Sequence, residues 1–189
     1  MSSRTVIYDK DFIKKVVPTF DFLNGKHFPT IGEINKDWDS CRIRIDDMLS
    51  NAPELCKSAV IQQYNEYIIY NELKENKVLA PIIFTSSDER GIPILGFPKF
   101  RPIVENDEFY KYTDEENFVL LGMFAEKYGL NFSNVRDFID LVQEVCIYIG
   151  IREDDILYNL SNVGYNPDYG LRVIDYGLVS GTENFVLVI

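Results

Sequence analysis

The chain has 189 residues, of which 46% are hydrophobic and 14% aromatic, so it is long and apolar enough for one domain with a substantial core. Asp and Glu number 30 against 19 Lys and Arg, and the resulting net charge of −11 argues against direct binding of nucleic acid. The three widely spaced cysteines, the single histidine and the lack of an apolar run of about 18 residues exclude a disulfide framework, a His-based zinc site and a membrane span.

The first quarter of the chain predicts short elements. Residues 1–27 are expected to form an N-terminal appendage, with a short helix over 11–17 that ends before Pro18. Residues 28–34 and 41–45 are predicted strands, because apolar and polar residues alternate, most clearly in Cys-Arg-Ile-Arg-Ile.

A long helix is predicted over 53–75, where apolar residues recur at steps of three and four. It is followed by a predicted strand over 78–84, a turn over 86–91 and a second strand over 92–97. Together these elements predict a small sheet lobe spanning 28–97.

Residues 98–112 are rich in proline and charge and are expected to act as a hinge. The second part, 113–189, begins with two apolar helices predicted over 116–128 and 134–149. The thick apolar coverage of the second helix is typical of a buried helix.

A hairpin is predicted over 163–174, because two β-type runs flank the turn sequence Asn166-Pro167-Asp168-Tyr169-Gly170. Asn162 enters the first strand and Asp175 leaves the second, so their oxygen-bearing side chains are expected at the same end of the hairpin. Oxygen ligands of this kind suit Mg²⁺, so this pair is a candidate metal site.

The sequence Ile174-Asp175-Tyr176-Gly177-Leu178 resembles the Asp-Phe-Gly motif of protein kinases, with Tyr in place of Phe. Asn162 falls where those enzymes have the asparagine of the catalytic loop, and the whole string is similar to small kinase-like proteins of bacteriophages. The resemblance implies an α+β, two-lobed protein-kinase-like fold with a small antiparallel sheet lobe and a truncated helical lobe. It also implies Mg²⁺ and ATP as cofactors, with Asn162 and Asp175 as the metal ligands.

The resemblance assigns further cofactor-binding residues. Glu66 takes the place of the helix glutamate that holds the family's strand lysine, and Gly32 stands alone where the family has a glycine-rich loop. The Val-Ala-x-Lys motif itself is absent. Arg42, Arg44 or Lys57 is expected to supply the cation in its place, and spacing does not choose among them.

The catalytic base of the family lies five residues before the asparagine, and that position here is Leu157, which accepts no proton. A second alignment, Asp154 with Asn159, restores the spacing but lengthens the run to the Asp-Tyr-Gly motif. We favour the first alignment, in which Asp154 or Asp155 reaches the site from one turn away as the candidate catalytic residue.

Three functions are consistent with these features. The favoured one is a catalytically degraded kinase-like protein that acts as a binding or structural component, in the host cytoplasm or in a virion. The alternatives are a minimal Mg²⁺-ATP phosphotransferase and a small acidic immunity-type or inhibitor protein. A protein partner is expected, and the apolar run 185–189 predicts strand addition to a second copy or another protein.

Overall fold

The computed structural model describes residues 4–103, 114–130, 132–149 and 162–176. The strands of the larger sheet are β1 (Thr5–Tyr8), β2 (Phe12–Val16), β3 (Phe84–Ser87) and β4 (Pro93–Pro98), and those of the smaller sheet are β5 (Arg101–Pro102), β6 (Val163–Asn166) and β7 (Gly170–Val173). The helices are α1 (Ile31–Ile34), α2 (Trp38–Leu49), α3 (Glu54–Leu73), α4 (Asp114–Lys127) and α5 (Phe132–Ile149), with short 3₁₀ turns η1 (Asp21–Leu23) and η2 (Lys74–Asn76). Helices and two small antiparallel sheets confirm the α+β class.

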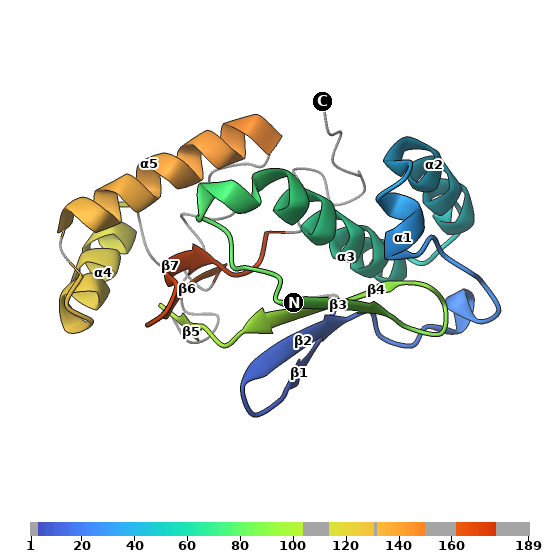
Figure 1. Ribbon diagram of the computed structural model, residues 1–189, viewed down its shortest axis with the longest axis horizontal. Helices are drawn as coiled ribbons and strands as arrows, with labels where there is room; N and C mark the ends of the chain where they lie inside the picture. The colour runs from blue at the N-terminus through green and yellow to red at the C-terminus, as the bar shows by residue number, and fades with distance from the viewer. Residues whose placement is uncertain (1–3, 104–113, 131, 150–161, 177–189) are drawn as a thin grey trace.

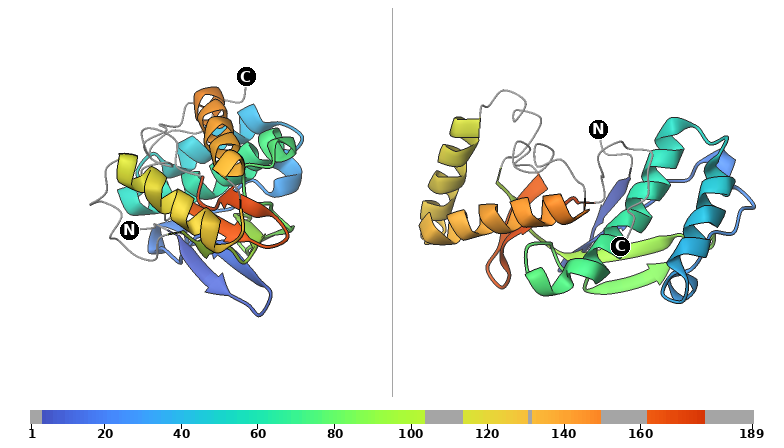
Figure 2. Two further views of the ribbon diagram at one scale, coloured as in Figure 1. Left: turned by 90° about the vertical axis from the view of Figure 1, so that its left-hand side faces the viewer. Right: turned by 90° about the horizontal axis from the view of Figure 1, so that it is seen from above.

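The molecule is elongated. Helices α4 and α5 lie at one end and α1 and α2 at the other, with α3 and the larger sheet between them (Figure 1). The view from above shows the same order along the long axis (Figure 2). None of the helices that the structure describes has the length and apolar character that a membrane span requires.

The larger sheet has the strand order β1-β2-β4-β3, with every pair antiparallel. The predicted helix over 11–17 is therefore wrong, because Phe12–Val16 is a strand, and Thr5–Tyr8 is a second strand of the same sheet. β-branched and aromatic residues dominate Thr5–Tyr8, and Asp9-Lys10-Asp11 forms the tight connection in which the Asp9 N–H donates to the Phe12 carbonyl (2.9 Å). This hairpin signal outweighs the short helical pattern.

The predicted helix over 53–75 is confirmed by α3, which packs on the larger sheet and buries most of its length. The strands predicted over 28–34 and 41–45 are wrong, because α1 and α2 occupy those stretches. Over the longer window of α2 the buried residues recur every four positions, at Cys41, Ile45 and Leu49. Five alternating residues were too short a window to separate this helical period from a strand.

The strand predicted over 78–84 is largely wrong. Leu79 makes only an isolated parallel bridge to Val173, and the paired strand β3 begins at Phe84. Pro81 interrupts the run, because it has no N–H to give to a ladder. The predicted turn and the following strand are confirmed by the antiparallel pairing of β3 with β4.

The second part of the chain follows the sequence prediction closely. Helices α4 and α5 confirm the helices predicted over 116–128 and 134–149, and Gly129 takes the left-handed conformation (φ 69°) just after α4. The hairpin predicted over 163–174 is confirmed by β6 and β7. Hydrogen bonds of 2.8 Å link the backbone of Val173 to residues Val78 and Ala80, so the hairpin is fastened to the segment between α3 and β3.

Candidate functional site

A cluster of charged side chains lies where β2, α3 and the end of β7 meet. Lys15 lies on β2, and its Nζ donates to Oε1 of Glu66 on α3 at 2.6 Å. The Glu66 side chain is fully buried and that of Lys15 is 6% exposed. The sequence did not reveal a lysine for Glu66 to hold; in the structure Glu66 forms an ion pair with Lys15.

Arg4 enters the same cluster from the residue before β1. Its guanidinium pairs with Oε2 of Glu66 through one terminal nitrogen and lies 2.6 Å from Oδ1 of Asp175 through the other. Gln63 accepts a further hydrogen bond from Arg4 at 3.2 Å. The Arg4 side chain is 1% exposed and that of Glu66 is fully buried, whereas the side chain of its second carboxylate partner, Asp175, is 26% exposed.

Asp175 contacts both cations of the cluster, Arg4 and Lys15. Besides Arg4, its Oδ1 lies 3.5 Å from Lys15 Nζ and accepts a hydrogen bond from the Gln62 side-chain amide at 3.2 Å. Burial raises the pKa of Asp175, but the charges of Lys15 and Arg4 outweigh this effect and hold that pKa below its ordinary value. The carboxyl group is therefore ionised and already neutralised by two cations.

A cavity of about 300 Å³ opens beside Lys15 and Asp175. Asn162 lies on its wall with these two residues, so the structure brings the predicted pair Asn162 and Asp175 together. The rest of the lining is mostly apolar: Val6, Tyr8, Ile13, Ala80, Phe97, Pro98, Lys99, Phe100, Pro102 and Ile174. A polar end and an apolar body suit a small molecule that carries an apolar group and polar substituents.

Four of the cations and glycines predicted for this site lie elsewhere. Arg42 and Arg44 are on α2, and Arg44 makes an exposed ion pair with Glu33 (3.1 Å). Lys57 precedes Glu66 by nine residues on α3, about 13 Å along the helix axis. Neither Arg44 nor Lys57 is among the residues that line the cavity beside Asp175.

Gly32 does not line this cavity either. Gly32 lies inside α1, where the Glu33 carboxylate accepts hydrogen bonds from the N–H and hydroxyl of Thr30 at 2.8 and 2.9 Å. This is the start of a helix rather than a loop that cradles phosphate. The candidate catalytic residues Asp154 and Asp155 fall outside the described residues.

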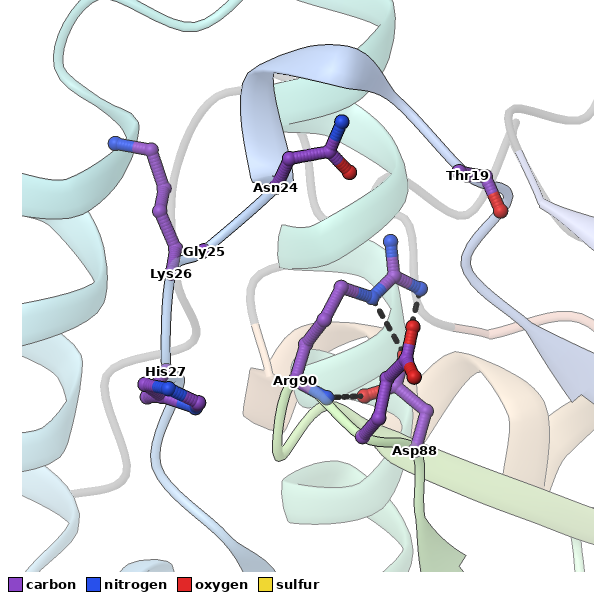
Figure 3. A pocket seen from close by; sticks show the side chains of 8 residues that line it. Thr19, Asn24, Gly25, Lys26, His27, Asp88 and Arg90 are labelled. Carbon is purple, nitrogen blue, oxygen red and sulfur yellow. Dashed lines mark hydrogen bonds and ion pairs between the residues drawn. The ribbon is translucent and has the colours of Figure 1, made fainter.

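A second hollow, of about 560 Å³, lies on the surface between residues 19–27 and the β3–β4 turn (Figure 3). Its Arg90 donates to the Asp88 carboxylate at 2.8 Å and to two backbone carbonyls just after β2 at 3.0 and 3.1 Å. Lys26 points away from these residues and donates to a backbone carbonyl at the end of α2 at 3.2 Å. Arg90 therefore holds the β3–β4 turn against the segment after β2, and Lys26 holds its own loop against α2. Both side chains have a structural role.

Comparisons with models of protein families, with curated proteins and with solved structures gave no match. The site must therefore be interpreted from its own geometry. Among the described residues, no three His, Cys, Asp or Glu side chains gather closely enough to hold a metal ion. At the pair Asn162 and Asp175, one carboxylate oxygen of Asp175, Oδ1, is already bound by Arg4 at 2.6 Å and lies 3.5 Å from Lys15 Nζ.

Sequence reasoning missed Arg4 and Lys15, the two cations of the site. The missed signal for Lys15 was the hairpin: once Phe12–Val16 is a strand, alternation places Ile13 and Lys15 on one face. Its neighbours on β4 across that face, Phe97 and Leu95, are buried. A lysine on an otherwise apolar strand face requires a buried acid, and Glu66 is that acid. Arg4 had no comparable signal, because it precedes the first strand.

Proposed function

We propose that this protein is a kinase-like protein that has lost phosphoryl transfer and acts as a binding or structural component. The kinase-like part rests on the sheet lysine Lys15 paired with the helix acid Glu66, next to an Asp-Tyr-Gly aspartate that follows a hairpin. Protein kinases hold ATP phosphates and Mg²⁺ with groups of this kind. The four-stranded sheet with α3 forms the small lobe, and α4, α5 and the β6–β7 hairpin belong to the second lobe.

The single observation that carries the loss of catalysis is the position of Arg4. Its guanidinium binds Glu66 and Asp175 at once and is almost wholly buried. A Mg²⁺ ion at Asp175 would place a divalent cation beside a carboxylate that already has two monovalent cationic partners, Arg4 and Lys15. Displacing Arg4 would leave a buried arginine without its acids, which costs several kcal/mol.

The second candidate function, a minimal Mg²⁺-ATP phosphotransferase, is favoured by a different observation. The Lys15–Glu66 pair is intact at 2.6 Å, and it borders a cavity of about 300 Å³. That volume lies at the lower end of the range for small-molecule sites. Under this candidate, nucleotide binding would have to move Arg4 away from Asp175.

A protein partner belongs to the proposal, because a kinase-like protein without catalysis works through what it binds. The apolar run 185–189, which lies outside the described residues, is the segment we propose for strand addition to such a partner. The phage resemblance favours a partner in a viral assembly, in the host cytoplasm or in the virion.

The deciding experiment measures thermal unfolding of the wild type with Mg²⁺ alone, ATP alone and both together, alongside the release of labelled phosphate from ATP. We expect no shift that depends on Mg²⁺ and no turnover. Mg²⁺-dependent turnover that disappears in Asp175→Ala, and persists in the control Asp168→Ala in the exposed β6–β7 turn, would establish the phosphotransferase instead.

A further inference from the structure

The larger sheet ends on one side in a strand whose outer edge has no described partner. Among the described strands, β1 pairs with β2 alone and lies at the edge of the sheet (Figure 1). All four of its residues are exposed. The exposed fractions of its apolar side chains rise from 37% for Val6 through 47% for Ile7 to 77% for Tyr8. Soluble proteins usually protect such an edge with a charge, a proline or a bulge, and Thr-Val-Ile-Tyr has none of these.

We propose that β1 is a homodimer interface, in which a second copy of this chain adds its own β1 antiparallel to the first. The two larger sheets then become one continuous sheet about a twofold axis normal to it. A strand edge is complementary to itself under such an axis, because each outward N–H of one copy donates to a carbonyl of the other copy, and each outward carbonyl accepts from an N–H of that copy.

The register of the dimer follows from the faces of the strand. Val6 is paired with Lys15 and Tyr8 with Ile13, so Val6 and Tyr8 share the face that carries α3, whereas Ile7 points to the other face. A twofold axis normal to the sheet keeps each face on its own side. Centring the axis on Ile7 places Ile7 opposite Ile7 of the second copy and each Val6 opposite a Tyr8.

These pairs favour association. Aromatic residues opposite β-branched residues, and β-branched residues opposite one another, are among the stabilising cross-strand pairs.

Charge favours this edge as well: the chain carries a net charge of −11, which repels a second copy in general, yet β1 itself is uncharged. Four residues per strand make a small interface, so we expect a weak dimer with a Kd on the order of tens of micromolar.

The dimer also bears on the cavity beside Asp175. Val6 and Tyr8 line that cavity, and Tyr8 is the more exposed of the two. A second copy paired along β1 would bring its own Val6 against Tyr8 and cover this side of the cavity. The inference does not depend on the proposed function, since it rests on the edge strand alone.

The test is the mass in solution as a function of concentration, measured for the wild type and for charge variants at the twofold centre. We expect the wild type to approach twice the chain mass of 21.9 kDa at high concentration. Ile7→Lys and Ile7→Glu should each be at least tenfold weaker in self-association, because like charges would face each other. An equimolar mixture of the two variants should recover association.

Two controls separate this interface from others. Ser86→Lys adds the same charge on the same face at the opposite edge of the sheet and should leave the dimer intact. Deleting residues 184–189 should also leave it intact, whereas a monomeric deletion variant would assign association to the C-terminal run and overturn the inference. A wild type that remains monomeric at millimolar concentration, or a mixture that recovers nothing while both variants keep the wild-type melting temperature, would overturn it too.

Discussion

Lys15 Nζ and Oε1 of Glu66 lie 2.6 Å apart, although 51 positions separate the two residues in the sequence. The contact joins the second strand of the chain to the middle of its longest helix. Lys15 Nζ also donates to the Ile174 carbonyl at 2.6 Å, so one ammonium group connects β2, α3 and the segment after β7. The side chains of the candidate site therefore also connect the larger sheet to the smaller one.

Replacing Glu66 by Gln should be strongly destabilising. The change leaves Lys15 and Arg4 buried with one carboxylate fewer, and removing one partner of a buried ion pair costs about 3–5 kcal/mol. Urea unfolding at pH 7 measures the loss. The control Glu75→Gln removes an exposed carboxylate from η2 and should change the free energy of unfolding by less than about 0.5 kcal/mol. Equal effects of the two substitutions would mean that the cluster contributes nothing to stability.

The sequence predicted the parts of the fold that have long, strongly periodic signals. Helices α3, α4 and α5 and the β6–β7 hairpin each extend a pattern over many residues or bracket it with turn residues, and all were predicted correctly. The first 50 residues were predicted poorly because their elements are short. A stretch such as Cys-Arg-Ile-Arg-Ile satisfies both periods until the flanking residues Trp38 and Leu49 are included.

The candidate site was predictable only in part for a related reason. Asn162, Asp175 and Glu66 follow or lie within well-predicted elements, and the structure brings Asp175 and Glu66 into one cluster. Lys15 and Arg4 belong to the N-terminal hairpin, whose pairing with β4 spans about 80 positions of sequence. No local pattern encodes that pairing, so the cations of the site become visible only in three dimensions.

Gly96 should be intolerant of substitution. A Cβ at this position of β4 would overlap the ring of Phe84, which crosses the outer face of the sheet and packs edge-on against Phe12 with 5.0 Å between ring centroids. We expect Gly96→Ala to lower the free energy of unfolding by about 1–3 kcal/mol. Gly122→Ala is the matched control: it has open space in α4 and should stabilise the protein by about 0.5–1 kcal/mol. Urea unfolding of both variants measures the contrast, and a neutral Gly96→Ala would show that Phe84 moves without cost.

The ion cluster predicts how stability depends on acid pH. Because the folded pKa of Asp175 lies below its unfolded value, the charged carboxylate stabilises the fold above about pH 4, and this contribution is lost as pH falls through the folded pKa. Asp175→Asn should cost about 1–3 kcal/mol at pH 7. The gap between wild type and variant should narrow as the pH falls below about 4, because the carboxyl takes up its proton first in the unfolded chain and only at lower pH in the folded protein.

Urea unfolding at pH 7, 5, 4 and 3 measures that gap, provided that both proteins unfold in a single transition. The control Asp168→Asn removes an exposed carboxylate from the β6–β7 turn and should change stability at pH 7 by less than about 0.5 kcal/mol. A gap that widens as the pH falls would contradict the sign of the effect and would mean that the Asp175 carboxylate is better stabilised in the unfolded chain.

The last prediction is that Arg4 prevents the Asp175 carboxylate from binding a divalent cation. In Arg4→Ala the Asp175 carboxylate keeps Lys15 at 3.5 Å and Gln62 at 3.2 Å but loses its closest partner, the guanidinium at 2.6 Å. Asn162 lies on the same cavity wall, so the Asp175 oxygen released by Arg4 has a second oxygen-bearing side chain nearby, of the kind that divalent cations bind. We expect the variant to bind Mg²⁺ in the millimolar range, seen as a rise in melting temperature with added Mg²⁺, while the wild type shows none.

Adding Asp175→Ala to Arg4→Ala should abolish the rise, and Arg101→Ala, which removes an exposed arginine, should behave as the wild type does. A wild type that responds to Mg²⁺ as strongly as Arg4→Ala would show that Arg4 does not block the carboxylate, and the argument for lost catalysis would lose its support.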